Sequence, residues 1–151
     1  MAKELEVERA ERWVRVACWV GALTDAGAAI QMLFPSVFAF AYRPREFHPG
    51  PEYGFAMGMG ASLMIGWTVL LLWASRKPIE RRGVLLLTVF PVVLGLVINE
   101  MASIAEGFVP TGPLVPVFAL QLALSGLFLV SYRRASAPPS RDAAVAAHPG
   151  Q

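Results

Sequence analysis

Two long apolar runs joined by a short basic turn constrain this chain more than any other feature. The runs cover residues 54–74 and 83–106, and the turn between them, residues 76–82, contains four basic side chains. About 20 apolar residues, rising 1.5 Å each, cover a hydrocarbon core roughly 30 Å thick. A turn with that much charge does not stay in lipid. The pattern therefore predicts a helical hairpin that crosses a membrane twice.

The composition extends this prediction to the whole chain. Of its 151 residues 56% are hydrophobic and 16% charged, and the mean hydropathy is +0.53, which is too apolar for a soluble domain of this size. We expect an all-α, integral membrane four-helix bundle with spans at about 13–34, 54–74, 83–105 and 114–132. Residues 1–12 are expected to form a cytoplasmic helical extension. Residues 135–151, rich in Ala, Pro and Ser, are expected to form a disordered tail.

The basic residues predict the orientation of the spans. Eleven of the 13 Lys and Arg residues would lie on one side, in the N-terminal segment, the central turn and the C-terminal tail. Only Arg43 and Arg45 would lie on the other side. The positive-inside rule then predicts a multi-pass protein of the cell membrane with both termini in the cytoplasm.

Small residues recur at helical spacing in the first two spans. The second span has a row at intervals of four: Gly54, Gly58, Ser62 and Gly66. The first span has a similar row: Ala17, Gly21, Asp25 and Ala29. Such rows let helix backbones approach closely in lipid, so we expect these two spans to pack as neighbours. The same row on the second span would equally serve a contact with another copy of the chain.

A proline interrupts the third span. Pro91 cannot donate to the carbonyl of Leu87, and its ring crowds the preceding turn. A kink is therefore expected there, eased by the Thr88 hydroxyl.

Polar residues inside the spans are the candidate ligand-binding groups. At about 1.5 Å per residue from the basic ends, Asp25 and Gln121 fall in a middle layer, and Gln31, Asn99 and Glu100 fall in a second layer nearer the opposite face. A carboxylate at a helix centre costs about 2.5 to 3.5 kcal/mol, and the sequence places no Lys, Arg or His inside a span to offset it. Asp25 is therefore expected to be protonated, hydrogen-bonded to Thr24 or Gln121, or available to a cation from outside the chain.

Motifs for other chemistry are absent from the sequence. It has no phosphate-binding glycine loop, no dinucleotide fingerprint, and no zinc-protease or serine-hydrolase motif. A single cysteine, Cys18, cannot form an internal disulfide or a cysteine-based metal site. No cofactor, metal or nucleic acid is expected. Several methionines at similar depth would suit Cu(I), but flexible core filling explains them better.

One stretch carries a resemblance. The run from Met57 to Trp67, the segment from Leu70 to Ala74, Pro78, and the segment from Glu80 to Thr88 resemble small prokaryotic four-span membrane proteins. That resemblance implies the fold and brings no activity with it. In outline the chain is also similar to small multidrug-resistance transporters, which have an acidic residue in the first span. The four-span group of sterol isomerases and sigma-2 receptors, which bind amine-like ligands through buried acids, shares the same outline.

Three functions remain open at this stage. The first is binding, with transport as an extension, of a small hydrophobic or cationic molecule between Asp25 and Glu100. The second is a non-catalytic accessory or structural subunit that docks on another membrane protein, or on a second copy, through its small residues. An intramembrane enzyme is the third, although the sequence identifies no catalytic partners for it.

Overall fold

The structure is a computed structural model that describes residues 2–136, all of them in helices, turns or short connecting segments. Four stretches are long and apolar enough to cross a membrane. The first, second and fourth are the helices α1 (Ala2–Leu33), α3 (Pro51–Ser75) and α6 (Thr111–Ser136). The third consists of three consecutive pieces: α4 (Gly83–Leu87), the π-helical segment η1 (Thr88–Val93) and α5 (Leu94–Ala105). The all-α prediction is confirmed, and the chain is a multi-pass membrane protein.

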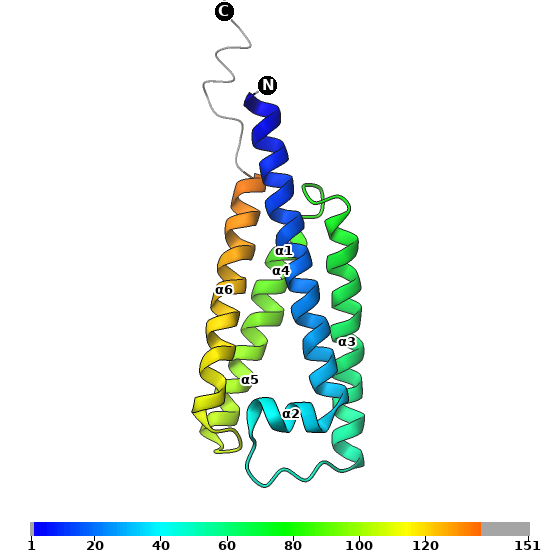
Figure 1. The fold of residues 1–151 in the computed structure, drawn as a ribbon, viewed down its shortest axis with the longest axis vertical. Coiled ribbons are helices and arrows are strands. Elements are labelled where there is room, and N and C mark those ends of the chain that lie inside the picture. Colours follow the sequence, from blue (N-terminus) through cyan, green and yellow to red (C-terminus); the bar gives the residue numbers. More distant parts are fainter. Residues whose placement is uncertain (1, 137–151) are drawn as a thin grey trace, which may run out of the picture.

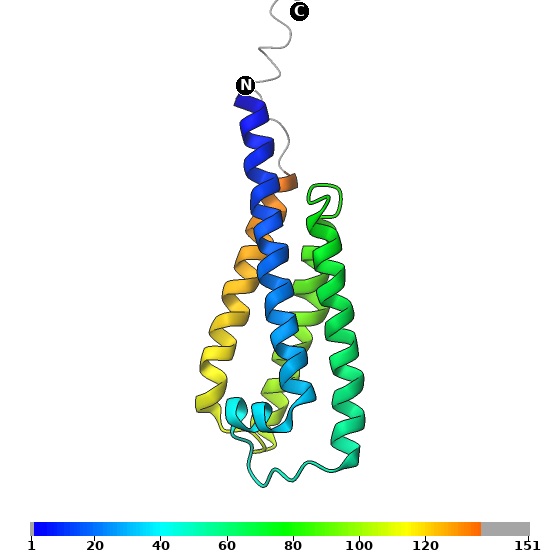
Figure 2. The same cartoon turned by 45° about the vertical axis from the view of Figure 1, so that its right-hand side comes forward.

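The spans run up and down in a single bundle. The beginning of α1, the end of α6 and the turn at residues 76–82 share one end, which we call the terminal end; the remaining connections lie at the opposite, loop end (Figures 1 and 2). The helix α1 packs along both α3 and α6, and α6 also packs against the third span. A short helix, α2 (Pro35–Tyr42), lies across the loop end of the bundle (Figure 1).

The buried apolar core lies in the half of the bundle nearer the terminal end. Its central side chains are Phe128, Leu71 and Leu85, each at most 1% exposed. The predicted small row of α1 is buried against them, and Gly21 lies so close to Phe128 and Leu71 that a methyl group there would be 2.9 Å from Phe128 Cζ. Small residues on α1 thus let two large side chains fill the space between three helices.

The helices α1 and α3 are neighbours, as predicted, but they meet through a different face of α3. Ala61 and Leu71 are buried in the contact, and Met32 of α1 lies 3.1 Å from where a Cβ on Gly60 would be. In contrast, a Cβ on Gly54, Gly58 or Gly66 would meet no atom of the described chain within 4 Å. The row at intervals of four drifts around the helix, so it faces away from α1.

Several helix ends differ from the predicted bounds. The helix α3 begins at Pro51 rather than at residue 54, because proline is well tolerated in the first turn, where its missing N–H has no helical partner. The helix α6 extends from Thr111 to Ser136, beyond the expected 114–132. The helix α1 is continuous from Ala2, so residues 2–12 extend the first span without a break. The expected disordered tail falls mostly on residues 137–151, which lie outside the described part of the chain.

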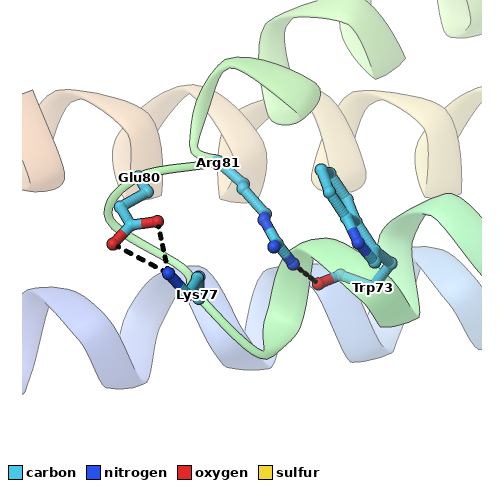
Figure 3. A network of polar contacts seen from close by, with 4 residues as sticks. All are labelled: Trp73, Lys77, Glu80 and Arg81. Carbon is cyan, nitrogen blue, oxygen red and sulfur yellow. Dashed lines mark hydrogen bonds and ion pairs between the residues drawn. The ribbon is translucent and has the colours of Figure 1, made fainter.

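The basic turn closes the end of α3 through one arginine. Arg81 donates a hydrogen bond of 2.6 Å to the carbonyl of Trp73, and its guanidinium lies 3.4 Å from the centre of the indole ring (Figure 3). Lys77 and Glu80 form an ion pair across the same turn, 3.1 Å apart. The Trp73 carbonyl thereby has a second donor besides the backbone N–H of Arg76, because Arg81 reaches back over the last turn.

The distortion around Pro91 takes the form of a π-helical segment from Thr88 to Val93. The Thr88 hydroxyl donates to the carbonyl of Val84, 2.9 Å away, and not to that of Leu87. Thr88 also accepts a 3.1 Å hydrogen bond from Trp67 Nε1 of α3. The Thr88 hydroxyl thus joins the third span to α3.

Candidate functional site

The best-defined polar contact inside the bundle joins α5 to α6. Gln121 donates from Nε2 to both carboxylate oxygens of Glu100, at 3.1 and 2.9 Å. Both side chains are buried, with 8% of Glu100 and 7% of Gln121 exposed. The donation to both oxygens suits an ionised carboxylate, which accepts at four lone-pair positions. The sequence placed these two residues in different layers, and the structure brings them together.

Asp25 lies at the level of Gln121 on the adjoining helix. The Ser131 hydroxyl donates to the carbonyl of Trp13, and Gly21 faces Phe128, so α1 and α6 are antiparallel neighbours. Asp25 comes twelve residues after Trp13, which places it opposite residue 119 of α6. It comes four residues after Gly21, which places it opposite residue 124, so Asp25 lies opposite the segment 119–124. Asp25 is only 8% exposed, and its Oδ2 is buried without a hydrogen-bond partner in residues 2–136.

The two partners expected for Asp25 are engaged elsewhere. The Thr24 hydroxyl donates to the carbonyl of Val20, 2.9 Å away, and the Gln121 amide nitrogen serves Glu100. In addition, no basic side chain in the described part of the chain forms an ion pair with either acid. Within the described residues, Asp25 on α1 and Glu100 on α5 are thus two buried carboxyl groups without a basic partner, and Gln121 of α6 donates to Glu100.

An aromatic cluster from α2 and its neighbourhood covers the loop-end side of this region. Phe38 stacks on Tyr42 with ring centres 5.0 Å apart, and also contacts Phe47 and Tyr53. Burial, and secondly the negative charge of Glu100, raises the pKa of Tyr42 above its ordinary value.

The remaining predicted ligand residues are placed differently. Gln31 is half-buried and Asn99 is exposed, although Asn99 is adjacent to the buried Glu100 in sequence. The backbone carbonyl of Asn99 accepts a hydrogen bond from the Ser103 hydroxyl. Neighbouring residues on a helix point about 100° apart, so burial of one side chain of this pair turned the other outward.

Sequence reasoning missed the Trp67–Thr88 contact. Thr88 was considered only in relation to Pro91, and Trp67 had no expected role. The two residues are 21 positions apart on either side of the basic turn, at positions that a hairpin brings to similar depth. A tryptophan in the middle of a span, away from the interfaces where this residue is enriched, was the available signal.

Surface hollows are found at the two ends of the molecule, away from the acids. One, of about 470 Å³, lies between α2 and the start of α6 and is lined mainly by Phe40, Pro113 and Pro116, with Arg43. The other lies over charged residues near the start of α1. No group of three His, Cys, Asp or Glu residues within the described range could hold a metal ion.

Comparison with family models, curated proteins and solved structures found no match to this chain. The likeness to small four-span membrane proteins is therefore carried by the architecture, and any functional assignment has to come from the residues themselves.

Proposed function

We propose that this protein binds a small cationic or hydrophobic molecule within the membrane, at Asp25, Glu100 and Gln121, and that transport of the molecule is the activity this binding serves. A site of this kind would be reached from the loop end, beside α2. Gln31 and Asn99, from the expected second layer, would then lie along the approach to the acids.

One observation carries the proposal: two buried carboxyl groups in the membrane without a basic partner in the described chain. A charged acid in a span is costly, and such residues mostly mark ligand or ion pathways. A cation supplied from outside would offset the charge and would also give Asp25 Oδ2 a partner. Neither acid lines the two surface hollows and both side chains are buried, so we propose that side chains around the acids, or α2, move to admit the ligand.

The proposed orientation follows from charge. The terminal end holds the turn at residues 76–82 and the basic ends of α1 and α6, whereas the loop end holds Arg43 and Arg45. We propose that the terminal end faces the cytoplasm and that ligand approaches from the other side.

Thermal stabilisation of the purified protein by a panel of amines and lipids tests the binding proposal. Binding at this site predicts that at least one ligand raises the melting temperature of the native chain and that Asp25→Asn and Glu100→Gln reduce the shift. Glu106→Gln is the matched control, because Glu106 is an exposed carboxylate of the same segment. Equal shifts in all four proteins would exclude this site, and no shift with any compound would remove the proposal.

A second candidate, an accessory or structural subunit, is favoured by the small residues of α3 at intervals of four, Gly54, Gly58, Ser62 and Gly66, which we call the α3 small-residue row. A Cβ on Gly54, Gly58 or Gly66 would meet no atom of the described chain within 4 Å, so the row is open to another helix, from a second copy or a different membrane protein. Gly58→Leu and Gly66→Leu would block that approach. The mass of the native assembly in lipid nanodiscs checks it, with Gly95→Leu, an equally open glycine on α5, as the control. An unchanged mass in all variants, equal to one chain, would argue against this candidate.

A further inference from the structure

The buried polar groups near the proposed site contain more hydrogen-bond acceptors than free donors. Three buried side-chain atoms of the described chain have no hydrogen-bond partner: the acceptors Asp25 Oδ2 and Gln121 Oε1, and the hydroxyl of Tyr53. Glu100 adds to the acceptors, because its carboxylate has about four lone-pair positions and Gln121 is its only hydrogen-bond partner within residues 2–136. Asp25, Gln121 and Glu100 are each more than nine-tenths buried.

The donors at the same level of the bundle are already used. Gly21 faces Leu71 and Gly60 faces Met32, so counting from either contact places Asp25 opposite residue 67 of α3. Trp67 Nε1 donates to Thr88, and the hydroxyl of Thr68 donates to the carbonyl of Met64. Thr24, beside Asp25, is likewise committed to Val20. Among the described residues, the Tyr53 hydroxyl is a buried donor without a partner, but it supplies one O–H and no charge, so neither acid gains a positive partner from it.

We infer that the ligand is a compact cation with several N–H donors, of the primary ammonium or guanidinium type. This rests on the proposed function and narrows its ligand class. Such a group brings three to five N–H donors together with the positive charge that the two acids require. It would satisfy Asp25 and Gln121 Oε1 while it shares Glu100 with the Gln121 amide.

Other ligand classes satisfy this arrangement less well. A quaternary ammonium supplies charge but no N–H donor, so the buried acceptors would stay unpaired. A neutral alcohol supplies one donor and no charge. An anion would be repelled by both carboxylates. The contrast between ammonium groups with and without N–H is therefore the sharpest test.

The test uses four probes with the same butyl chain: butylammonium, butylguanidinium, butyltrimethylammonium and butanol. Their affinities for the full chain in lipid nanodiscs are measured by calorimetry at neutral pH. We expect the first two to bind at least about tenfold more tightly than butyltrimethylammonium, since hydrogen bonds to charged groups are lost in the quaternary probe. Asp25→Asn and Glu100→Gln should each reduce this selectivity, whereas Glu106→Gln should keep it.

The outcomes separate this inference from the proposed function. If all three cations bind equally and lose affinity in Glu100→Gln, the site binds cations but does not select donors, and the inference is overturned while the function stands. If butanol binds as well as the cations, the ligand class is hydrophobic and the inference again fails. If no probe and no member of the wider amine and lipid panel binds, both fail. Whether the three cations bind equally is measured on the native protein alone. The inference therefore stays testable even where a variant does not fold.

Discussion

The side-chain amide of Gln121 donates to both carboxylate oxygens of Glu100, at 3.1 and 2.9 Å. Neither Glu100 nor Asp25, the other buried acid of the bundle, has a basic partner in residues 2–136. The contact between Gln121 and Glu100 ties α5 to α6. It supplies a neutral donor to a group that would otherwise be buried and unsatisfied. Its consequences for stability can be measured without knowledge of the ligand.

Replacement of Gln121 by Leu should destabilise the protein. The carboxylate of Glu100 would lose its only hydrogen-bond partner, at a cost of about 1 to 3 kcal/mol in the free energy of unfolding. The double variant Glu100→Leu/Gln121→Leu should recover most of this loss, because two apolar groups leave nothing unpaired. Reversible unfolding in mixed micelles measures both. A double variant less stable than Gln121→Leu would mean that Glu100 has an additional favourable contact.

Replacement of Asp25 should have the opposite sign in the absence of ligand. Asp25 Oδ2 is buried without a partner, so removal of the carboxyl group in Asp25→Leu should stabilise the ligand-free protein by roughly 1 to 3 kcal/mol. Asp25→Asn keeps a polar group and should stabilise less. The same unfolding experiment applies. A loss of stability in Asp25→Leu would show that this carboxyl group is bonded in the native protein.

Gly21→Ala should test the tight contact between α1, α3 and α6. The added methyl would be 2.9 Å from Phe128 Cζ and 3.1 Å from Leu71 Cδ1, and both of these side chains are almost fully buried. Overpacking of this kind costs typically about 1 to 3 kcal/mol. Gly126→Ala is the control, since its methyl would meet no atom of the described chain within 4 Å. Equal melting temperatures for the two variants would contradict this packing.

Arg81→Lys should weaken the closure of the basic turn. Lysine keeps the charge but cannot both cover the Trp73 ring with a planar group and donate to the Trp73 carbonyl. We expect a loss of about 1 kcal/mol, because the contact is partly exposed. Arg76→Lys changes the same residue type in the same turn, where the side chain has no hydrogen bond within residues 2–136, and should have no measurable effect. Thermal melts of both variants provide the comparison, and identical losses would attribute the effect to general charge chemistry.

The sequence alone determined the four apolar spans, the basic turn at residues 76–82 and the buried row of small residues on α1. These features depend on length, hydrophobicity and helical spacing, which act locally along the chain. The burial of Asp25 could also be expected, because a polar residue within a span avoids lipid, whereas Glu100 was expected nearer the opposite face.

Only the tertiary structure decided which groups meet. The pairing of Gln121 with Glu100 depends on the register between α5 and α6, and the outward position of the α3 small-residue row depends on the rotation of α3 against α1. Neither is fixed by the spacing of residues within one helix, because a span can rotate or slide in lipid until its neighbours pack against it. The crossing of α2 over the loop end likewise depends on the helices it covers. The sequence places Asp25 and Glu100 within the spans. The packing of the helices decides how few hydrogen-bond donors surround them.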